Sequence, residues 1–345
     1  MTAEHRRTGL VRSIAHRLEG AEESLPDEGR LSSFDRATTW LNSDPLTPQQ
    51  LRGRVVLVDF WTYTCVNWLR TVPYLRAWHE KYASSGLTII GVHTPEFGFE
   101  RDLDNVTRQS RNLGIDYPIA VDSDFGVWDE FANNYWPAIY LADAEGRIRY
   151  HHFGEGEYPR TEMVIQRLLI DAGAADLDLG LAMVDPEGLQ VAADWASLRS
   201  PETYLGYGQS SGFVSENADH YDRPHVYDER RALALNTWDL AGEWTHARHA
   251  AVLDAPGGRI SFQFHARDVN LVMGPTSGRV IRFRVQLDGQ VVETSLGTDV
   301  EPGGGGVVRA QNTYQLIRQR GPITDHLFEI EFLDAGVEAY CFTFG

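Results

Sequence analysis

The sequence has few cysteines and no long apolar run. Its 345 residues include only Cys65 and Cys341. Because long secreted proteins held by disulfides usually contain more cysteines, this number is typical of a reducing compartment. No stretch approaches the ~20 apolar residues of a membrane span, and no apolar run follows Arg6 and Arg7, as it would in a secretory signal. We therefore expect a cytoplasmic protein without a membrane span.

Basic residues are also scarce. Lys and Arg together number 31 against 49 Asp and Glu, which gives a formal net charge of −18. Phosphate binding needs clustered Lys and Arg, so this balance argues against nucleic acid as a main partner. The apolar content of 42% and charged content of 23% are ordinary for a soluble globular protein, and the length allows two domains.

The most informative stretch is residues 55–73. Val55–Phe60 has the length and composition of a buried strand. From Cys65 onward the apolar residues follow helical spacing, at Leu69, Val72, Trp78 and Tyr82. Unpaired amides and the positive end of a helix dipole favour an anion at such a junction, so we expect a Cys65 pKa below the usual ~8.5. Cys65 is thus predicted to be a nucleophile; the alternative is a buried structural cysteine.

This stretch resembles the active-site segment of thioredoxin-fold proteins. In that family Asp-Phe-Trp ends the central strand, Cys-x-x-Cys opens the next helix, a proline kinks it, and a cis-proline faces the cysteines. The corresponding residues here are Asp59-Phe60-Trp61, Cys65, Pro73 and Trp136-Pro137. The resemblance implies that Asp59 lies beneath the cysteine and handles protons, although it is equally consistent with a local hydrogen bond. It also implies a cis peptide bond before Pro137.

Other segments extend the resemblance over roughly residues 34–345. Gly91–Glu96 and Tyr117–Asp122 resemble the extra strand and helix of TlpA-type redoxins. The soluble C-terminal part of DipZ-type proteins, a thioredoxin domain followed by a β-sandwich, is similar in three phrases: Trp40–Ser43, Phe60–Tyr63 and Phe153–Gly156.

The second cysteine of Cys-x-x-Cys is replaced by Trp68. A dithiol oxidoreductase resolves its mixed disulfide with that second thiol, so this chain would need an external one. The resemblance therefore implies a cofactor-free, thiol-dependent oxidoreductase that acts through Cys65 alone on a disulfide or peroxide. Its partners would be proteins or low-molecular-weight thiols and disulfides. The alternative is a non-catalytic binding or scaffold protein with a degenerate thioredoxin domain.

Thr62 precedes Cys65 by three residues, the spacing of the peroxiredoxin motif Pro-x-x-x-Thr-x-x-Cys. Val58 occupies the proline position, so half of that motif is present. A peroxidatic cysteine would become a sulfenic acid and need an external thiol for recovery. Cys65, Thr62 and Asp59 are the predicted catalytic residues.

Further residues are predicted to lie around Cys65 at the carboxyl ends of the strands, where α/β folds bind ligands. The predicted substrate-binding residues are Trp61, Trp68, Trp136, Pro137, His93 and Glu96. His93 is also a candidate general base, although a lone histidine at a strand end is more often structural. Trp68 shields the sulfur, offers a flat surface to a substrate, or fills the space of the missing cysteine. No histidine pair beyond adjacent His151-His152 has ligand spacing, so no metal is predicted.

The expected organisation is a tail (1–33), a thioredoxin-like domain (34–172), a linker (173–200) and an antiparallel β-sandwich (201–345). The fold class is therefore an α/β thioredoxin fold followed by an all-β sandwich, resembling a jelly roll or carbohydrate-binding module. In the tail, Leu10, Val11, Ile14 and Leu18 form an amphipathic stretch, either a surface-docking helix or a frayed end. In the first domain we expect helices at 45–51, 102–113, 125–134 and 161–170, strands at 87–92 and 117–121, and a hairpin of 137–142 with 147–153.

The period of two after residue 201 predicts the sandwich strands, as in Ile260–Phe264 and Ile281–Leu287. Aromatic residues there would line a glycan site or, more often, fill the core: Tyr204, Tyr207, Trp238 and Trp244. Docking of the sandwich on the first domain or on a protein partner is the favoured role. Cys341 is predicted to be a packed residue of the sandwich, and a resolving role would require it to approach Cys65 from the other domain.

Overall fold

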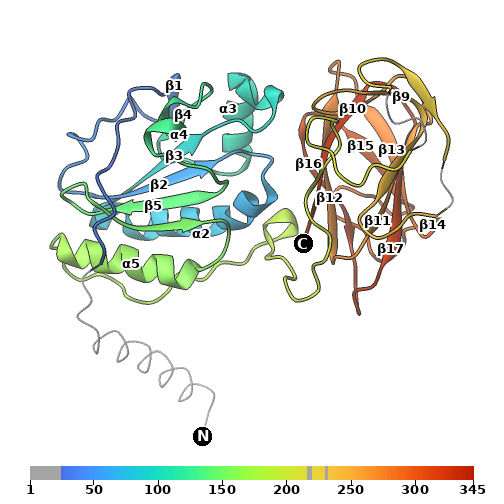
Figure 1. Cartoon of the computed structure of the whole chain (residues 1–345). Helices are drawn as coiled ribbons and strands as arrows, with labels where there is room; N and C mark the ends of the chain where they lie inside the picture. Colours follow the sequence, from blue (N-terminus) through green and yellow to red (C-terminus); the bar gives the residue numbers. More distant parts are fainter. Residues whose placement is uncertain (1–24, 216–219, 230–231) are drawn as a thin grey trace, which may run out of the picture.

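The computed structural model describes residues 25–215, 220–229 and 232–345. It has an α/β domain with elements from residue 39 to 171, called the redoxin domain below, and a β domain with strands from residue 203 to 344. The two domains lie side by side, and the linker runs between them (Figure 1). The amphipathic stretch predicted near Leu10 lies outside the described residues. Within those residues, no helix combines the length and apolarity that crossing a membrane requires.

The redoxin sheet has the strand order β1-β4-β3-β2-β5-β6. Its strands are β1 (Thr39–Leu41), β2 (Val55–Trp61), β3 (Leu87–His93), β4 (Ile119–Val121), β5 (Ala138–Ala142) and β6 (Ile148–Phe153). β2, β3 and β4 run parallel, whereas β5, β6 and β1 pair antiparallel with their neighbours. Every residue of β2 is buried, because both faces of this central strand are covered; this explains its unbroken apolar run.

Helices cover both faces of the sheet, as predicted. They are α2 (Val66–Tyr82), α3 (Leu103–Asn112), α4 (Gly126–Glu130) and α5 (Tyr158–Asp171), with 3-10 turns η1 (Ala83–Ser85), η2 (Gly98–Arg101) and η3 (Gly188–Gln190). Alternate residues of β2 point to opposite sides. Val55 and Leu57 pack with residues of α2 and α5, whereas Val56 and Val58 pack with Val127 of α4.

Two expected helices differ in the structure. Residues 45–47 have no regular structure and residues 48–53 form turns, with Leu51 N donating to Thr47 O at 3.2 Å. The predicted helix at 45–51 is therefore wrong, because Pro48 disfavours the helical conformation at the preceding Thr47. α4 ends at Glu130, four residues before the expected end, because Ala132 adopts a left-handed φ of 49°.

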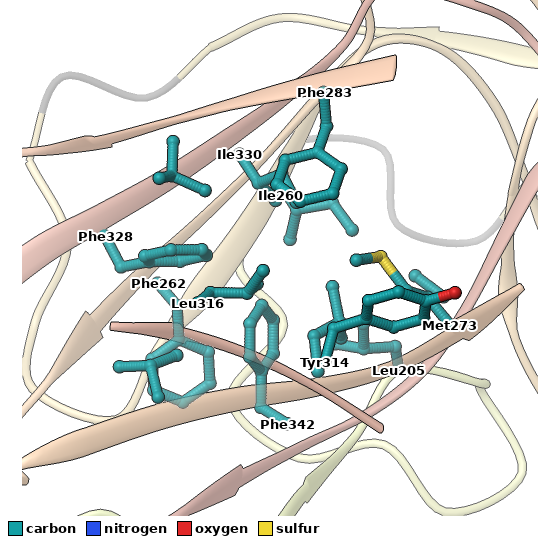
Figure 2. Packing of buried hydrophobic residues seen from close by; sticks show 14 of the residues in the cluster. Leu205, Ile260, Phe262, Met273, Phe283, Tyr314, Leu316, Phe328, Ile330 and Phe342 are labelled. Carbon is teal, nitrogen blue, oxygen red and sulfur yellow. The ribbon is translucent and has the colours of Figure 1, made fainter. Parts of the chain in front are cut away.

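The β domain is antiparallel throughout its strand pairs, as predicted. Its strands are β7 (Thr203–Tyr204), β8 (His225–Tyr227), β9 (Trp238–His246), β10 (Ala251–Leu253), β11 (Arg259–Phe264), β12 (Asp268–Pro275), β13 (Ile281–Leu287), β14 (Gln290–Val291), β15 (Gly305–Val308), β16 (Asn312–Arg318), β17 (His326–Phe332) and β18 (Val337–Phe344). β9 joins the two halves of the sheet, because it pairs with β11 near its start and with β10 near its end. The core between the halves is rich in aromatic rings, and Phe262 and Phe342 meet there at 5.1 Å between centroids (Figure 2).

The linker contacts both domains. Its η3 turn packs against α2. Arg318 of the β domain donates to Gly188 O at 3.0 Å, and Arg267 donates to Ala192 O at 2.8 Å. β12, β16 and the end of the chain lie on the side of the β domain that faces the redoxin domain (Figure 1).

Candidate functional site

Cys65 is the N-cap residue of α2, directly after the turn that follows β2. Its backbone is extended (φ −70°, ψ 109°), and its carbonyl accepts the first helical bond from Leu69 N at 2.9 Å. The amides of Trp68 and Asn67 at the start of α2 lower the pKa of the thiol, although its side chain makes no capping hydrogen bond in this arrangement. The thiol is free and partly accessible. The predicted strand–helix junction is therefore present.

The pKa of Cys65 differs from the prediction. Burial raises it well above the usual thiol value, and the negative charges of Glu96 and then Glu202 raise it further. The two amides act in the opposite direction and are outweighed. In this closed arrangement Cys65 is therefore a neutral thiol at pH 7.

Trp68 occupies the place of the second cysteine. Its side chain is fully buried and stacks on Trp61, with ring centroids 4.2 Å apart and an interplanar angle of 20°. Its Nε1 donates to Asp59 Oδ2 at 2.9 Å. Burial raises the pKa of Asp59 to about 7, and the bond from Trp68 opposes part of that rise. The packing favours the space-filling role of Trp68 over a surface offered to a substrate.

His93 lies at the end of β3 and is completely buried. Its ring meets Trp61 edge-on at 4.7 Å and is parallel to Tyr63 at 5.9 Å. Within the described part of the chain neither ring nitrogen has a hydrogen-bond partner, and burial lowers the pKa of His93 to about 3. A neutral, enclosed imidazole favours the structural role over the general base. Gly91 makes room for the ring system, since a Cβ there would lie 2.8 Å from Trp61 Nε1.

A buried carboxyl, Glu100, connects the cysteine turn to the loop after β3. Its Oε1 accepts from Thr64 Oγ1 at 2.5 Å, and its Oε2 accepts from the amides of Glu96 and Phe97 at 2.7 and 2.8 Å. Burial raises the pKa of Glu100, while the hydrogen bonds from Thr64 and from the amides of Phe97 and Glu96 lower it. The hydroxyl of Thr62 is buried without a hydrogen-bond partner among the described residues, and the carbonyl of Thr62 accepts from Cys65 N at 3.3 Å.

Trp136 and Pro137 lie at the start of β5. The peptide bond between them is cis, as predicted. Trp136 is half-buried and its Nε1 donates to Thr94 O at 3.1 Å, whereas Pro137 is buried. These residues therefore contact the loop that also carries Glu96.

The β domain contacts the redoxin domain at residues before and after Cys65 in the sequence and at the loop after β3. Thr313 Oγ1 donates to Thr64 O at 2.7 Å, and the Tyr204 hydroxyl donates to the Glu96 carboxylate. Arg70 of α2 also donates to Phe344 O at 3.2 Å. This inter-domain contact confirms the predicted docking of the second domain.

Several residues of this arrangement were not singled out by sequence reasoning. Glu100, Glu202, Arg70 and Thr313 belong to no short motif, so no sequence signal identifies them. Tyr204 was predicted as a sugar-stacking or core residue, and its hydroxyl instead meets Glu96. Trp238 and Trp244 are fully buried, which agrees with the core-filling alternative and gives no support to a glycan site. Over the described residues, no group of three or more His, Cys, Asp or Glu side chains is arranged to hold a metal ion.

Together the β2–Cys65–α2 junction and the cis-proline define a thioredoxin-like protein with one cysteine in the motif. Residues 37–151 match the AhpC/TSA family, and residues 200–345 match the "Thioredoxin like C-terminal domain". The chain is 40% identical over 245 residues to Protein DipZ of Mycobacterium bovis, covering 69% of this chain and 34% of that protein. It thus spans about a third of the DipZ length. These matches confirm the resemblance to TlpA- and DipZ-type redoxins.

Shorter relatives match the first domain. The thiol-disulfide oxidoreductase YkuV of Bacillus subtilis is 28% identical over 132 residues, which cover 38% of this chain and 88% of YkuV. A solved structure described as a thioredoxin-like protein in the oxidized form is 28% identical and covers 41% of this chain and 96% of its own, with a TM-score of 0.39.

Proposed function

We propose that this chain is a thiol-disulfide oxidoreductase in which Cys65 attacks the disulfide of a protein or low-molecular-weight compound. The carrying observation is the position of Cys65 at the N-cap of α2, where the amides of Trp68 and Asn67 lower the pKa of its thiol. The name of YkuV supports this reaction. The AhpC/TSA match supports peroxide as a second substrate class, with an antioxidant role. The proposal places the reaction in the cytoplasm, where external thiols are available.

The first chemical step belongs to Cys65. Its thiolate would attack one sulfur of the substrate disulfide, form a mixed disulfide and release the other sulfur as a thiol. Trp68 cannot carry out the second step, so another thiol must attack the mixed disulfide. Asp59 and Thr62 act as positioning residues in this proposal, because Asp59 accepts a hydrogen bond from Trp68 and the carbonyl of Thr62 accepts one from Cys65 N at 3.3 Å.

The closed arrangement also favours a second candidate function, a non-catalytic scaffold. The raised pKa of Cys65 and the β domain bound at Thr64 and Glu96 both oppose thiolate chemistry. The two candidate functions predict different behaviour of Cys65 when substrate binding or thermal motion separates the two domains. In an enzyme the exposed Cys65 would then ionise, because the two helix amides lower its pKa, whereas in a scaffold Cys65 would not react.

The deciding experiment is the pH dependence of Cys65 alkylation by iodoacetamide, measured peptide by peptide in wild type and in Cys65→Ser. Parallel samples receive oxidised glutathione or hydrogen peroxide. A glutathione mixed disulfide or a trapped sulfenic acid on Cys65 is the expected result. No adduct on Cys65 with either reagent, together with alkylation only at strongly alkaline pH, would overturn the enzyme and leave the scaffold.

A further inference from the structure

Four residues of the β domain, one on each of four neighbouring strands, form a row that faces the redoxin domain: Tyr204, Cys341, Val272 and Thr313. In the sheet Cys341 of β18 is directly opposite Tyr204 on one side and Val272 on the other. Val272 is in turn opposite Thr313. Residues that are directly opposite in a sheet point to the same face, and neighbouring strands lie ~4.8 Å apart. Cys341 therefore shares one face with both ends of the row and lies within ~10 Å of each end.

Both ends of this row are hydrogen-bonded to the redoxin domain. Thr313 Oγ1 donates to Thr64 O at 2.7 Å, and the Tyr204 hydroxyl donates to Glu96. Thr64 directly precedes Cys65. The row thus runs from the cysteine turn to the loop after β3, with Cys341 between its two bonded ends.

Packing also places Cys341 at this contact. The register between β12 and β18 shifts at Val272, so Tyr340 is an extra residue beside Cys341. Tyr340 reaches the loop after β3, with ring centroids 5.3 Å from Phe97 and 4.8 Å from Phe99. Cys341 belongs to the same buried cluster. Cys341 is a packed residue of the β domain, as predicted, but it packs at this domain contact. The next residue, Phe342, points into the core between the two halves of the sheet (Figure 2).

The two thiols also share an electrostatic environment. The carboxylates of Glu96 and Glu202 raise the pKa of Cys65 and of Cys341, in each case after the larger effect of burial. The negative charge of Cys65 itself also raises the pKa of Cys341. Both thiols are free in this structure.

We propose that Cys341 is the resolving cysteine of this chain and supplies, from the β domain, the thiol that Trp68 replaced. The proposal rests on the proposed function of Cys65. In the step, Cys341 Sγ loses its proton and attacks Cys65 Sγ in the mixed disulfide. The Cys65–Cys341 bond forms while the bond to the substrate sulfur breaks, and the substrate leaves as a thiolate that takes up a proton. Two protein thiols are thereby oxidised and one substrate disulfide is reduced to two thiols.

This step gives the inter-domain contact a redox function. The two sulfurs must meet at about 2.05 Å, with their Cα atoms within about 7 Å. The resulting disulfide would join the domains, and an external dithiol would reduce it for the next cycle. In this cycle the external thiol reduces the Cys65–Cys341 disulfide. It does not attack the mixed disulfide between Cys65 and the substrate.

The test uses the full-length protein, reduced and freed of reductant, then exposed to oxidised glutathione and quenched with N-ethylmaleimide at successive times. Wild type is expected to yield a Cys65–Cys341 cross-linked peptide in a non-reducing peptide map. Cys341→Ala is expected to accumulate a Cys65–glutathione adduct that lasts about tenfold longer than in wild type, because the intramolecular thiol is lost. Cys65→Ser should give neither product.

The outcomes separate the two proposals. A lasting glutathione adduct on Cys65 of wild type, without the cross-link, would overturn the role of Cys341 and leave the proposed function intact. Absence of both products in wild type would overturn both. The wild-type map needs no variant, so a folding defect in Cys341→Ala does not weaken the test. Thr313→Val is the positioning control: it removes the bond to Thr64 and should slow the cross-link without preventing the first adduct.

Discussion

Trp68 Nε1 donates a hydrogen bond of 2.9 Å to Asp59 Oδ2. This bond joins the residue in the place of the second cysteine to the buried acid of the central strand. The acid therefore contacts an indole where the thioredoxin pattern implies a thiol. The same indole stacks on Trp61, so the replacement is integrated into the core.

Trp68→Cys is expected to restore a local dithiol at the cost of stability. The new thiol would lie three residues after Cys65 on α2, so oxidation should produce a short disulfide within the helix turn. Removal of the buried indole should lower the free energy of unfolding by about 3–5 kcal/mol. Trp68→Ser is the matched control, since it loses the same packing without gaining a thiol. Insulin reduction by Trp68→Cys that equals that of Trp68→Ser would contradict the prediction.

Asp59→Asn is expected to change how stability depends on pH. The pKa of Asp59 is about 7 in the folded chain, against an ordinary aspartate value of 3.8 in the unfolded chain, so between these values the unfolded chain has lost a proton that the folded chain retains. Wild-type stability from this group is therefore present below the lower value and falls as pH rises towards 7, by about 4 kcal/mol at most. Asparagine keeps an acceptor for Trp68 and does not titrate.

Urea unfolding of both proteins at about pH 5 and about pH 8 measures this effect, which should appear as a larger advantage of Asp59→Asn at the higher pH. Asp116→Asn changes an exposed carboxyl and serves as control. Equal pH dependence in wild type and Asp59→Asn would show that Asp59 does not titrate in this way.

Glu96→Gln is expected to lower the pKa of Cys65. The negative charge of Glu96 raises that pKa, whereas glutamine is neutral and still accepts the bond from Tyr204. Loss of the charge should move the alkylation midpoint of Cys65 to lower pH. Because burial also raises the pKa of Glu96, the difference should be largest in alkaline solution, where Glu96 is ionised. An unchanged midpoint would mean that Glu96 does not act on the thiol.

Tyr204→Phe is expected to weaken the contact between the two domains and so increase the accessibility of Cys65. The variant loses the hydrogen bond to Glu96 across the domain contact and keeps the ring beside Phe97. Loss of about 1 kcal/mol of contact energy should raise the alkylation rate of Cys65 about fivefold at constant pH. Tyr207→Phe is the control, because Tyr207 bonds Asp222 within the β domain. Equal rates in both variants would contradict a gating role for the domain contact.

Much of the redoxin domain follows from local pattern. The apolar run at 55–60 and the helical spacing after Cys65 predict β2 and α2, and Cys65 is indeed the N-cap between them. Asp102 was included in the predicted helix 102–113 and is its N-cap, accepting from the amides of Asp104 and Asn105. The failure at 45–51 is also local, since Pro48 disfavours a helical conformation at Thr47. Hydrophobic periodicity shows which face of a helix or strand is buried. Predictions from it are correct where that face packs against the core of its own domain.

The sequence by itself determined the strand–helix junction at Cys65, the cis-proline and the absence of a second cysteine in the motif. Only the tertiary structure decided what lies over the thiol. Tyr204, Thr313 and Cys341 are 139 residues or more from Cys65 in the chain, and the docking of the β domain brings them to the cysteine turn. The direction of the Cys65 pKa depends on that docking, because desolvation and neighbouring carboxylates outweigh the two helix amides. The local sequence pattern places the helix amides beside Cys65. The tertiary fold determines how much solvent reaches the thiol and which charged groups lie near it.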